Sequence, residues 1–226
     1  MNPAMRRWRI VFLIGTFAAV LGAGLVAQGE IRRARDDERY RDAQAALKAG
    51  VEVFSDDVTL SDDLTQDPKF GTQTTPADKA GSPSSPSNAG AAVRSIGRLQ
   101  IPKIDIDVAT VKYGRYADLE IGIGWMPQSA ALGEEGASII VGHRSLFGGP
   151  FRDLDQLVTG DPLTLVLPDG KSFDYEVVKT LIRRPSESFS DLLEGSESPR
   201  LVLVTCHPAN STDFRLIVVA DVAAKV

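Results

Sequence analysis

The chain has 226 residues, of which 43% are apolar and 24% charged, and this ordinary balance excludes both a wholly disordered protein and a fibrous repeat. A formal net charge of -5 argues against a dedicated nucleic-acid binder, because such proteins need a basic face that displaces counterions from phosphate. The single cysteine, Cys206, has no partner for an intrachain disulfide and no set of thiolates for a structural zinc site. We expect no metal and no cofactor.

Residues 10–27 form an apolar segment with no charged side chain, IVFLIGTFAAVLGAGLVA. A helix of this length rises about 27 Å, close to the ~30 Å of a bilayer core. The residues before a cut after Ala27 fit cleavage of a leader peptide poorly, so we predict an uncleaved transmembrane signal anchor that follows residues 1–9. Basic residues flank both ends of the segment, so charge alone leaves the orientation open.

Two polar segments follow this anchor. Residues 28–50 are rich in charged and helix-forming residues without a wide apolar stripe, which predicts a solvated helical stalk. Residues 51–94 are rich in Asp, Thr, Ser, Pro and Gly and have no hydrophobic period, which predicts a disordered linker. We therefore expect the folded domain over residues 95–226.

Short apolar runs bounded by turn residues dominate this last part of the chain and predict strands. The predicted strands are Gly97–Ile101, Val108–Tyr113, Ser138–Val141, Leu163–Leu167, Phe173–Leu181, Leu201–Cys206 and Phe214–Val222. Helical patterns are short and cover Tyr116–Ile121, Phe151–Val158 and Phe189–Glu194. Pro168-Asp169-Gly170 predicts a tight turn. The pattern indicates a mainly β domain, a mostly antiparallel barrel or sandwich, and periodicity does not decide between these two.

Cys206 ends one of the predicted strands, next to His207 and Pro208. Because side chains alternate along a strand, Val202, Val204 and Cys206 should share one face. The continuous apolar run also suggests that both faces of this strand are buried. A thiol at a strand end can be reached by a substrate, although a buried structural cysteine is the common alternative.

His143 and Arg215 also lie at the ends of predicted strands. His143 follows Gly142, which we expect to let the backbone turn. Arg215 either points outward from an edge strand or is buried as a fixed donor of hydrogen bonds. A thiolate nucleophile, an imidazole that moves protons and a guanidinium that stabilises an oxyanion together would transfer an acyl group from a peptide bond through a thioester.

The order of these residues resembles the sortase family. The segments that carry the resemblance are Ile101-Pro102-Lys103-Ile104, Gly142-His143-Arg144, Phe151-Arg152-Asp153-Leu154, Gly160-Asp161, Leu203-Val204-Thr205-Cys206 and Arg215-Leu216-Ile217-Val218. The resemblance implies an eight-stranded sortase-type β-barrel with short helices, anchored by a single span and held outside a Gram-positive cell. This orientation implies that residues 1–9 form a short cytoplasmic N-terminus. It also implies that Cys206 is the nucleophile, that His143 is the general acid and base, and that Arg215 steadies substrate and oxyanion.

The resemblance further implies a substrate-binding set made of Thr205, Val204, Arg144 and Ser145, and we assign His207 a structural role. The implied partners are secreted proteins that carry a C-terminal Leu-Ala-x-Thr-Gly or Leu-Pro-x-Thr-Gly sorting signal and an amine acceptor such as a peptidoglycan precursor. Cys206-His207-Pro208 and the loop over residues 147–151 look more like the actinobacterial class E sortases than class A.

Two other functions compete with this interpretation. An L,D-transpeptidase also uses a cysteine at the cell wall, but its signature places Ser-His-Gly before that cysteine, where this chain has Leu203, Val204 and Thr205. A non-catalytic wall-binding scaffold would keep the barrel without a reactive thiol. The sequence does not specify the exact signal, the acceptor amine or the oligomeric state.

Overall fold

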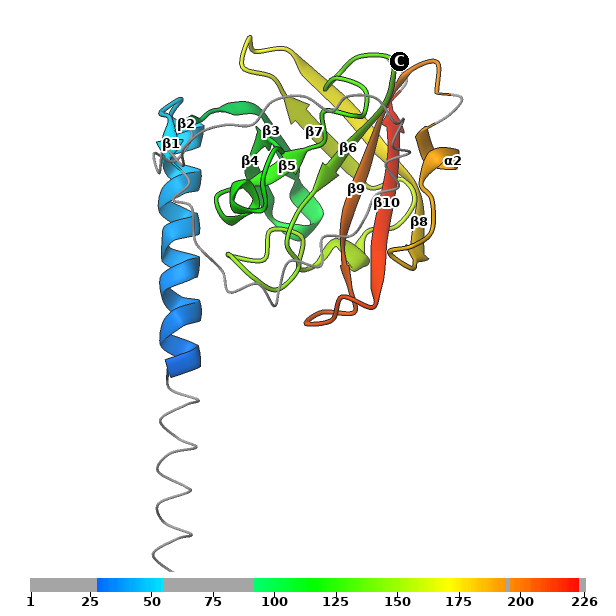
Figure 1. The fold of residues 1–226 in the computed structure, drawn as a ribbon. Helices are drawn as coiled ribbons and strands as arrows, with labels where there is room; N and C mark the ends of the chain where they lie inside the picture. The colour runs from blue at the N-terminus through cyan, green and yellow to red at the C-terminus, as the bar shows by residue number, and fades with distance from the viewer. Residues whose placement is uncertain (1–27, 55–91, 194–195, 224–226) are drawn as a thin grey trace, which may run out of the picture.

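The structure is a computed structural model that describes residues 28–54, 92–193 and 196–223. Its main strands are β3 (Ser95–Ile101), β4 (Ile106–Lys112), β5 (Ile123–Trp125), β6 (Gly136–Val141), β7 (Pro162–Val166), β8 (Ser172–Arg183), β9 (Pro199–His207) and β10 (Phe214–Val222). These eight strands close into a barrel in the order β10-β8-β7-β3-β4-β5-β6-β9 (Figure 1). Neighbouring strands are antiparallel except for the parallel pairs β4–β5 and β6–β9.

The predicted strands are all confirmed, and the fold is a barrel and not a sandwich. The prediction missed β5, the shortest strand of the barrel. The predicted helical segments contain η2 (Tyr116–Glu120), η3 (Leu154–Gln156) and α2 (Ser190–Leu193), and a further short helix, η1, covers Pro102–Ile104. The turn between β7 and β8 is also confirmed, with Gly170 at a φ of 86° that suits glycine.

Two apolar clusters lie on opposite sides of the β9 and β10 backbones. The barrel interior receives Leu201 and Leu203 of β9 together with side chains from the other main strands. The outer face of β6, β9 and β10 receives Val202 and Val204, and Leu192 of α2 covers this face. Burial on both faces of β9, predicted from its continuous apolar run, is confirmed, and it fixes the strand that carries Cys206 near its end.

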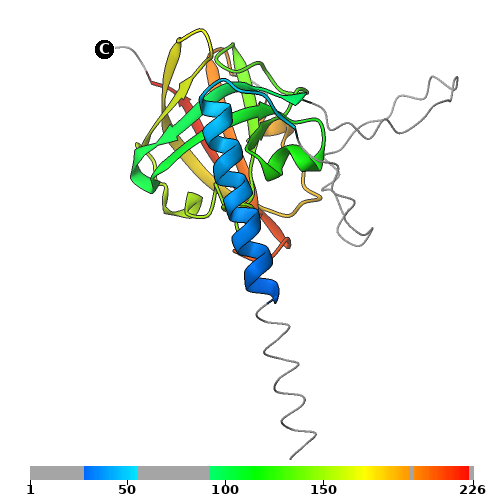
Figure 2. The same cartoon turned by 90° about the vertical axis from the view of Figure 1, so that its left-hand side faces the viewer.

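A helix over residues 28–48 lies along one side of the barrel (Figure 2), and we call it the N-terminal helix. The expectation of a fully solvated stalk was wrong, because Tyr40, Ala43, Gln44 and Leu47 are buried. Their spacing of three and four residues places them on one side of the helix. The Gln44 amide joins the helix to the barrel, since its Oε1 accepts from the Ala109 N–H at 2.7 Å and its Nε2 donates to the Ile121 carbonyl at 2.6 Å.

The segment predicted as a disordered linker, residues 51–94, is ordered at both ends. Strand β1 (Val53–Phe54) pairs with strand β2 (Ala92–Val93) in a separate two-stranded sheet. The intervening residues 55–91, the predicted anchor over residues 10–27 and the predicted cytoplasmic residues 1–9 lie outside the described residues. None of the helices in the described ranges combines the length and the apolar character needed to cross a bilayer.

Candidate active site

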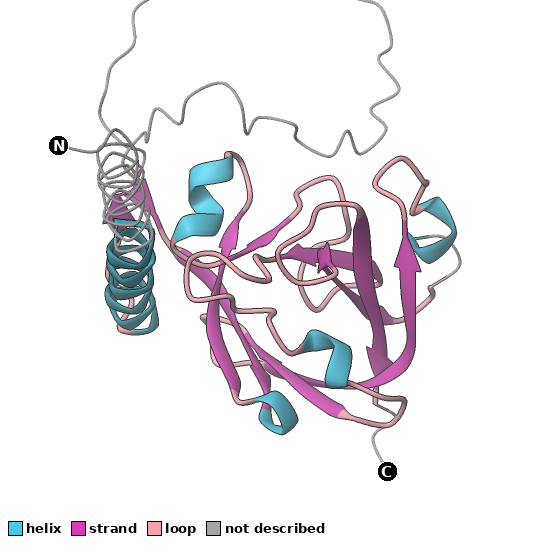
Figure 3. Ribbon diagram, turned by 90° about the horizontal axis from the view of Figure 1, so that it is seen from below, coloured by secondary structure: helices cyan, strands magenta, loops and turns pink. Residues whose placement is uncertain are grey.

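Strand topology brings the three predicted catalytic residues to one end of the barrel. Strands β6 and β9 are parallel neighbours, so their C-terminal ends meet, and the antiparallel strand β10 begins at the same end. His143 follows β6, Cys206 lies near the end of β9, and Arg215 lies near the start of β10. The loop that joins β9 to β10 marks this end at the bottom of Figure 1, and Figure 3 views the molecule from that side.

Cys206 and Arg215 face each other across the β9–β10 ladder as direct Cα partners. Side chains in such antiparallel pairs have Cβ atoms about 4.5–5.5 Å apart. The predicted alternation is confirmed, since Val204 of β9 and Ile217 of β10 both belong to the outer cluster. The half-buried thiol and the guanidinium therefore lie side by side at the end of the outer face.

His143 lies beside this pair. In the β6–β9 register Val141 is opposite Val204, and the Gly142 N–H donates to the Val204 carbonyl at 3.1 Å, so His143 and Cys206 each lie two residues beyond a matched pair. The imidazole Nε2 is buried without a hydrogen-bond partner in the described part of the chain. Burial lowers the pKa of His143 to about 4, so at neutral pH the ring is uncharged and can accept a proton.

Two aromatic rings hold the imidazole from either side. The ring of Tyr116 lies edge-on to His143 with centroids 5.3 Å apart, and the ring of Phe147 is tilted at 5.2 Å. Tyr116 is the first residue of η2, whose start is fixed because the Asp118 carboxylate accepts from the N–H groups of Gly114 and Arg115. These contacts exclude water from His143 and explain why its pKa is low.

The backbone around His143 is fixed on both sides. The Thr205 hydroxyl donates to the Gly142 carbonyl at 2.8 Å, and the Phe151 N–H donates to the His143 carbonyl at 3.0 Å. Gly142 does not have a positive φ, so the expected reason for this glycine was wrong. A Cβ at this position would lie 2.7 Å from the Phe151 ring, and close packing therefore requires glycine here.

Arg215 is buried without a carboxylate partner. Strand β10 lies between β8 and β9, so the edge-strand alternative is wrong, and Arg215 is only 7% exposed. One terminal nitrogen, Nη1, donates to the carbonyls of Thr212 and Phe214 at 2.9 and 3.0 Å. No ion pair to Arg215 occurs among residues 28–54, 92–193 and 196–223, so the other guanidinium N–H groups are free to stabilise negative charge.

Arg144 holds His207, the residue after Cys206, in place. It is 5% exposed, and its guanidinium contacts His207 Nδ1 at 2.8 Å, the Asp155 carboxylate at 2.6 Å and the Arg152 carbonyl at 3.2 Å. A guanidinium can only donate, so His207 Nδ1 accepts and the neutral ring carries its proton on Nε2. This contact agrees with a structural role for His207.

The residues expected to contact the substrate lie mainly behind the catalytic set. Val204 and Thr205 are each only 3% exposed, and Arg144 is occupied by protein partners. The Ser145 hydroxyl accepts from the Asn210 N–H at 3.0 Å and ties the segment after β6 to the β9–β10 loop. Val204, Thr205 and Arg144 therefore have little surface left for a peptide, whereas Ser145 is half-buried and its contact with a substrate stays a prediction.

Sequence reasoning missed the rings that contact the imidazole, Tyr116 and Phe147. Tyr116 begins a predicted helical segment, but nothing in the sequence connected that segment with His143, and only the glycines after Phe147 signalled an unusual turn. Over the described ranges, no group of three or more His, Cys, Asp or Glu side chains is placed to hold a metal ion.

Comparisons with known proteins agree with this geometry. Residues 99–223 match the sortase domain family. The chain is 37% identical over 112 residues to Sortase D of Bacillus subtilis, which covers 50% of this chain and 54% of that protein. It is 31% identical over 139 residues to Sortase SrtE1 of Streptomyces coelicolor, which covers 53% of this chain and 38% of that protein. The chain thus spans about half or less of the length of these curated relatives.

Solved structures share the barrel. Sortase A from Corynebacterium diphtheriae superposes with a TM-score of 0.54 at 27% identity, over 59% of this chain and 63% of that one. A Clostridium perfringens Sortase D5 transpeptidase superposes with a TM-score of 0.51 at 28% identity, over 58% of this chain and 80% of that one. The similarity covers the barrel that carries His143, Cys206 and Arg215.

Proposed function

The chain belongs to the sortase family, and from this membership we propose that it is a membrane-anchored cysteine transpeptidase that attaches secreted proteins to a cell-wall amine. One arrangement carries the proposal: Cys206 lies directly opposite Arg215, and His143 follows the parallel neighbour of the strand that holds the thiol. A nucleophile, a proton carrier and a free guanidinium are the groups that acyl transfer needs.

The reaction proceeds in two half-reactions. Cys206 gives its proton to His143, and the sulfur bonds to the carbonyl carbon of the signal's Thr, while Arg215 stabilises the oxyanion. The C–N bond to Gly then breaks, and His143 returns the proton to the leaving amine, which leaves a thioester. The nitrogen of the acceptor amine then bonds to the thioester carbon and passes a proton to His143. The C–S bond breaks, and His143 returns this proton to the sulfur, which regenerates the Cys206 thiol. Because burial lowers the pKa of His143 to about 4, the imidazolium is a minority species at neutral pH and turnover should be slow.

The substrate part of the proposal is a class E type specificity. We propose a sorting signal of the Leu-Ala-x-Thr-Gly type in preference to Leu-Pro-x-Thr-Gly, and an acceptor such as a peptidoglycan precursor. Cys206-His207-Pro208 and the similarity to Sortase SrtE1 support this class, and the similarity to Sortase D of Bacillus subtilis makes class D the competing assignment. Competition between the two signal peptides in one reaction measures the preference directly.

The cellular part of the proposal places the barrel outside the membrane. The apolar segment over residues 10–27 would cross the bilayer once, and the N-terminal helix would follow it on the outer side. Cysteine accessibility of the barrel in intact cells, measured with a membrane-impermeant maleimide that labels Cys206, tests this orientation. Labelling only after the cells are opened would contradict it.

The decisive experiment is a covalent adduct between the full chain and a Leu-Ala-x-Thr-Gly peptide. We expect a thioester by mass spectrometry in the wild-type protein and none in Cys206→Ala. Ser198→Ala, just before the start of β9 and away from the Cys206 end, serves as a matched control and should keep the adduct. An unchanged adduct in Cys206→Ala, or a wild-type thiol that resists alkylation and forms no adduct, would remove the enzyme and leave a wall-binding scaffold.

A further inference from the structure

The N-terminal helix touches the segment that carries the catalytic imidazole. The Asp37 carboxylate accepts from the Gly148 N–H at 2.9 Å, although the two residues are 111 positions apart. The Tyr40 ring lies against the same glycine, since a Cβ on Gly148 would come within 2.5 Å of Tyr40 Cδ1. Asp37 and Tyr40 are one turn apart on the helix, so both contact Gly148.

Gly148 lies in a strained turn. Phe147, Gly148 and Gly149 have φ values of 48°, 73° and 54°, three consecutive residues in the left-handed region. Glycine adopts this conformation freely, but for Phe147 it is unfavourable by about 1 kcal/mol or more, so surrounding contacts must hold it. The hydrogen bond from Gly148 to Asp37 and the packing of Tyr40 supply such contacts directly beside Phe147.

The turn delivers the Phe147 ring to His143, with 5.2 Å between the ring centroids. We propose that Asp37 and Tyr40 are positioning residues for catalysis, which act through Gly148 and Phe147 to hold the imidazole of His143 in place. This inference rests on the proposed function, because it assumes that His143 moves protons. It gives the helix next to the predicted anchor a role in the active site without any contact with the substrate.

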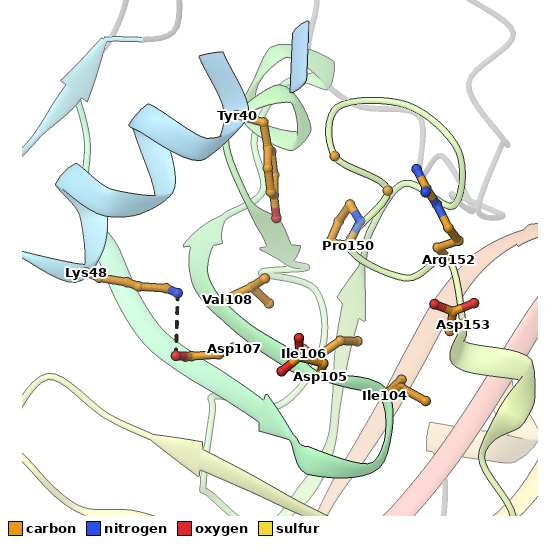
Figure 4. Close-up of a pocket in the computed structure, with 12 residues that line it drawn as sticks. Tyr40, Lys48, Ile104, Asp105, Ile106, Asp107, Val108, Pro150, Arg152 and Asp153 are labelled. Atoms are coloured by element: carbon orange, nitrogen blue, oxygen red, sulfur yellow. Dashed lines mark ion pairs between the residues drawn. The ribbon is translucent and has the colours of Figure 1, made fainter. Parts of the chain in front are cut away.

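The ring of Tyr40, and not its hydroxyl, makes this contact. The residue is 6% exposed, yet its hydroxyl has no hydrogen-bond partner within the described ranges. Figure 4 shows the hydroxyl directed toward the space above Val108, in a cavity of about 410 Å³ between the N-terminal helix and the barrel. Lys48 and Asp107 pair at 3.5 Å on the far side of this cavity.

The barrel does not depend on the two positioning residues for its core. The interior cluster and the outer cluster contain no residue of the N-terminal helix. A third cluster does, and it uses Ala43 and Leu47 of the helix against residues of β2, β4 and Ile121. Gln44 keeps its two hydrogen bonds to the barrel when Asp37 or Tyr40 is changed. Variants at these two positions should therefore keep a folded barrel, which a thermal melt can verify.

The first test compares three changes on one helix in the full chain. Asp37→Ala removes the acceptor for Gly148 and should lower kcat/KM with a Leu-Ala-x-Thr-Gly peptide about tenfold, since small displacements of catalytic groups have large effects on rate. Asp37→Asn keeps an oxygen acceptor and should restore most of the activity. Asp42→Ala removes the same charge from an exposed position and should change the rate less than twofold. Equal losses in Asp37→Ala and Asp42→Ala would overturn the proposal.

A second readout does not depend on activity. The chain has only 2 histidines, so the titration of each imidazole can be followed by NMR after ¹³C-histidine labelling, with Cys206, Arg215 and Tyr116 as the neighbouring ionisable groups left unchanged. The pKa of His143 is lowered to about 4 by burial, and it should rise toward 6.5 in Asp37→Ala, because a loosened Phe147 admits water. An unchanged titration overturns the positioning role even if the rate falls.

Tyr40 gives a matched pair of substitutions. Tyr40→Ala should lower the rate and raise the pKa of His143 as Asp37→Ala does, whereas Tyr40→Phe keeps the ring and should behave like wild type. Equal effects of Tyr40→Ala and Tyr40→Phe would contradict the claim that the ring carries the contact. The failures remain distinguishable, because a chain that forms no adduct at all disproves the proposed function, while the NMR titration still reports whether the helix holds His143.

Discussion

The β9–β10 pair and the segment after β6 hold catalytic groups in different ways. Cys206 and Arg215 lie on strands with hydrogen-bonded neighbours, and apolar clusters cover both faces of those strands. His143 lies beyond the last paired residue of β6 and depends on ring contacts, two backbone hydrogen bonds and a helix that precedes the barrel by many residues. The Cys206 thiol and the Arg215 guanidinium are therefore fixed by strand register, while the His143 imidazole is held by distant parts of the chain.

Replacement of Arg215 tests the role of the β9–β10 pair. Lysine keeps the charge but loses the planar fork of donors, so Arg215→Lys should lower kcat/KM about a hundredfold or more, the usual effect of losing an oxyanion donor. Arg183→Lys is a matched control, because Arg183 is the cross-strand partner of Arg215 on β8 and pairs instead with Asp191. Losses of similar size in both variants would show that Arg215 acts only through the sheet.

The arrangement of side chains on β9 could be predicted from the sequence, because the alternation of side chains along a strand is local. Alternation alone placed Val204 and Cys206 on one face, and the register of β10 then placed Arg215 opposite the thiol. β5 escaped prediction because it is only three residues long, and its central Gly124 packs so closely that a Cβ would lie 2.8 Å from Leu119. Its place in the barrel depends on its neighbours and not on a pattern of its own.

The helix contact could not be predicted, because its buried residues are not uniformly apolar. The helix docks through Tyr40, the small Ala43, Leu47 and Gln44, and the Gln44 amide bonds to the barrel backbone. A hydrophobic stripe is the signal that sequence patterns report, and Gln44 contributes hydrogen bonds instead. Likewise, buried partners such as those of Arg144 and Thr205 cannot be told from substrate contacts before the fold is known.

The acid dependence of folding stability tests how well the segment after β6 shields His143 from water. Burial lowers the pKa of His143 from 6.5 to about 4, so between these values the unfolded chain binds more protons than the folded one. The stability conferred by the neutral ring is complete above pH 6.5 and falls as the pH drops toward 4, by at most about 3 kcal/mol. Denaturant unfolding of the wild type and of His143→Asn between pH 4 and pH 7 measures this difference.

The difference between these two proteins isolates the imidazole. Glu120, whose pKa is raised by burial, is present in both proteins, so its contribution cancels. The wild type should lose stability relative to His143→Asn as the pH falls. A gap between the two proteins that stays constant from pH 7 to pH 4 would mean that water reaches His143 freely.

Thr205→Val tests the smallest expected effect. The Thr205 hydroxyl connects β9 to the segment that carries His143. Valine has a similar shape, but the Gly142 carbonyl loses its 2.8 Å hydrogen bond, so we expect a loss of about 1 kcal/mol in unfolding free energy and a fall of about fivefold in kcat/KM. Thr205→Ser should restore the rate. Thr110→Val on β4 is the matched control, because the Thr110 hydroxyl is buried with no partner in the described ranges and its removal should stabilise the protein or leave it unchanged. If both valines had the same effect, the loss would come from repacking of the barrel interior, and the bond to Gly142 would not position His143.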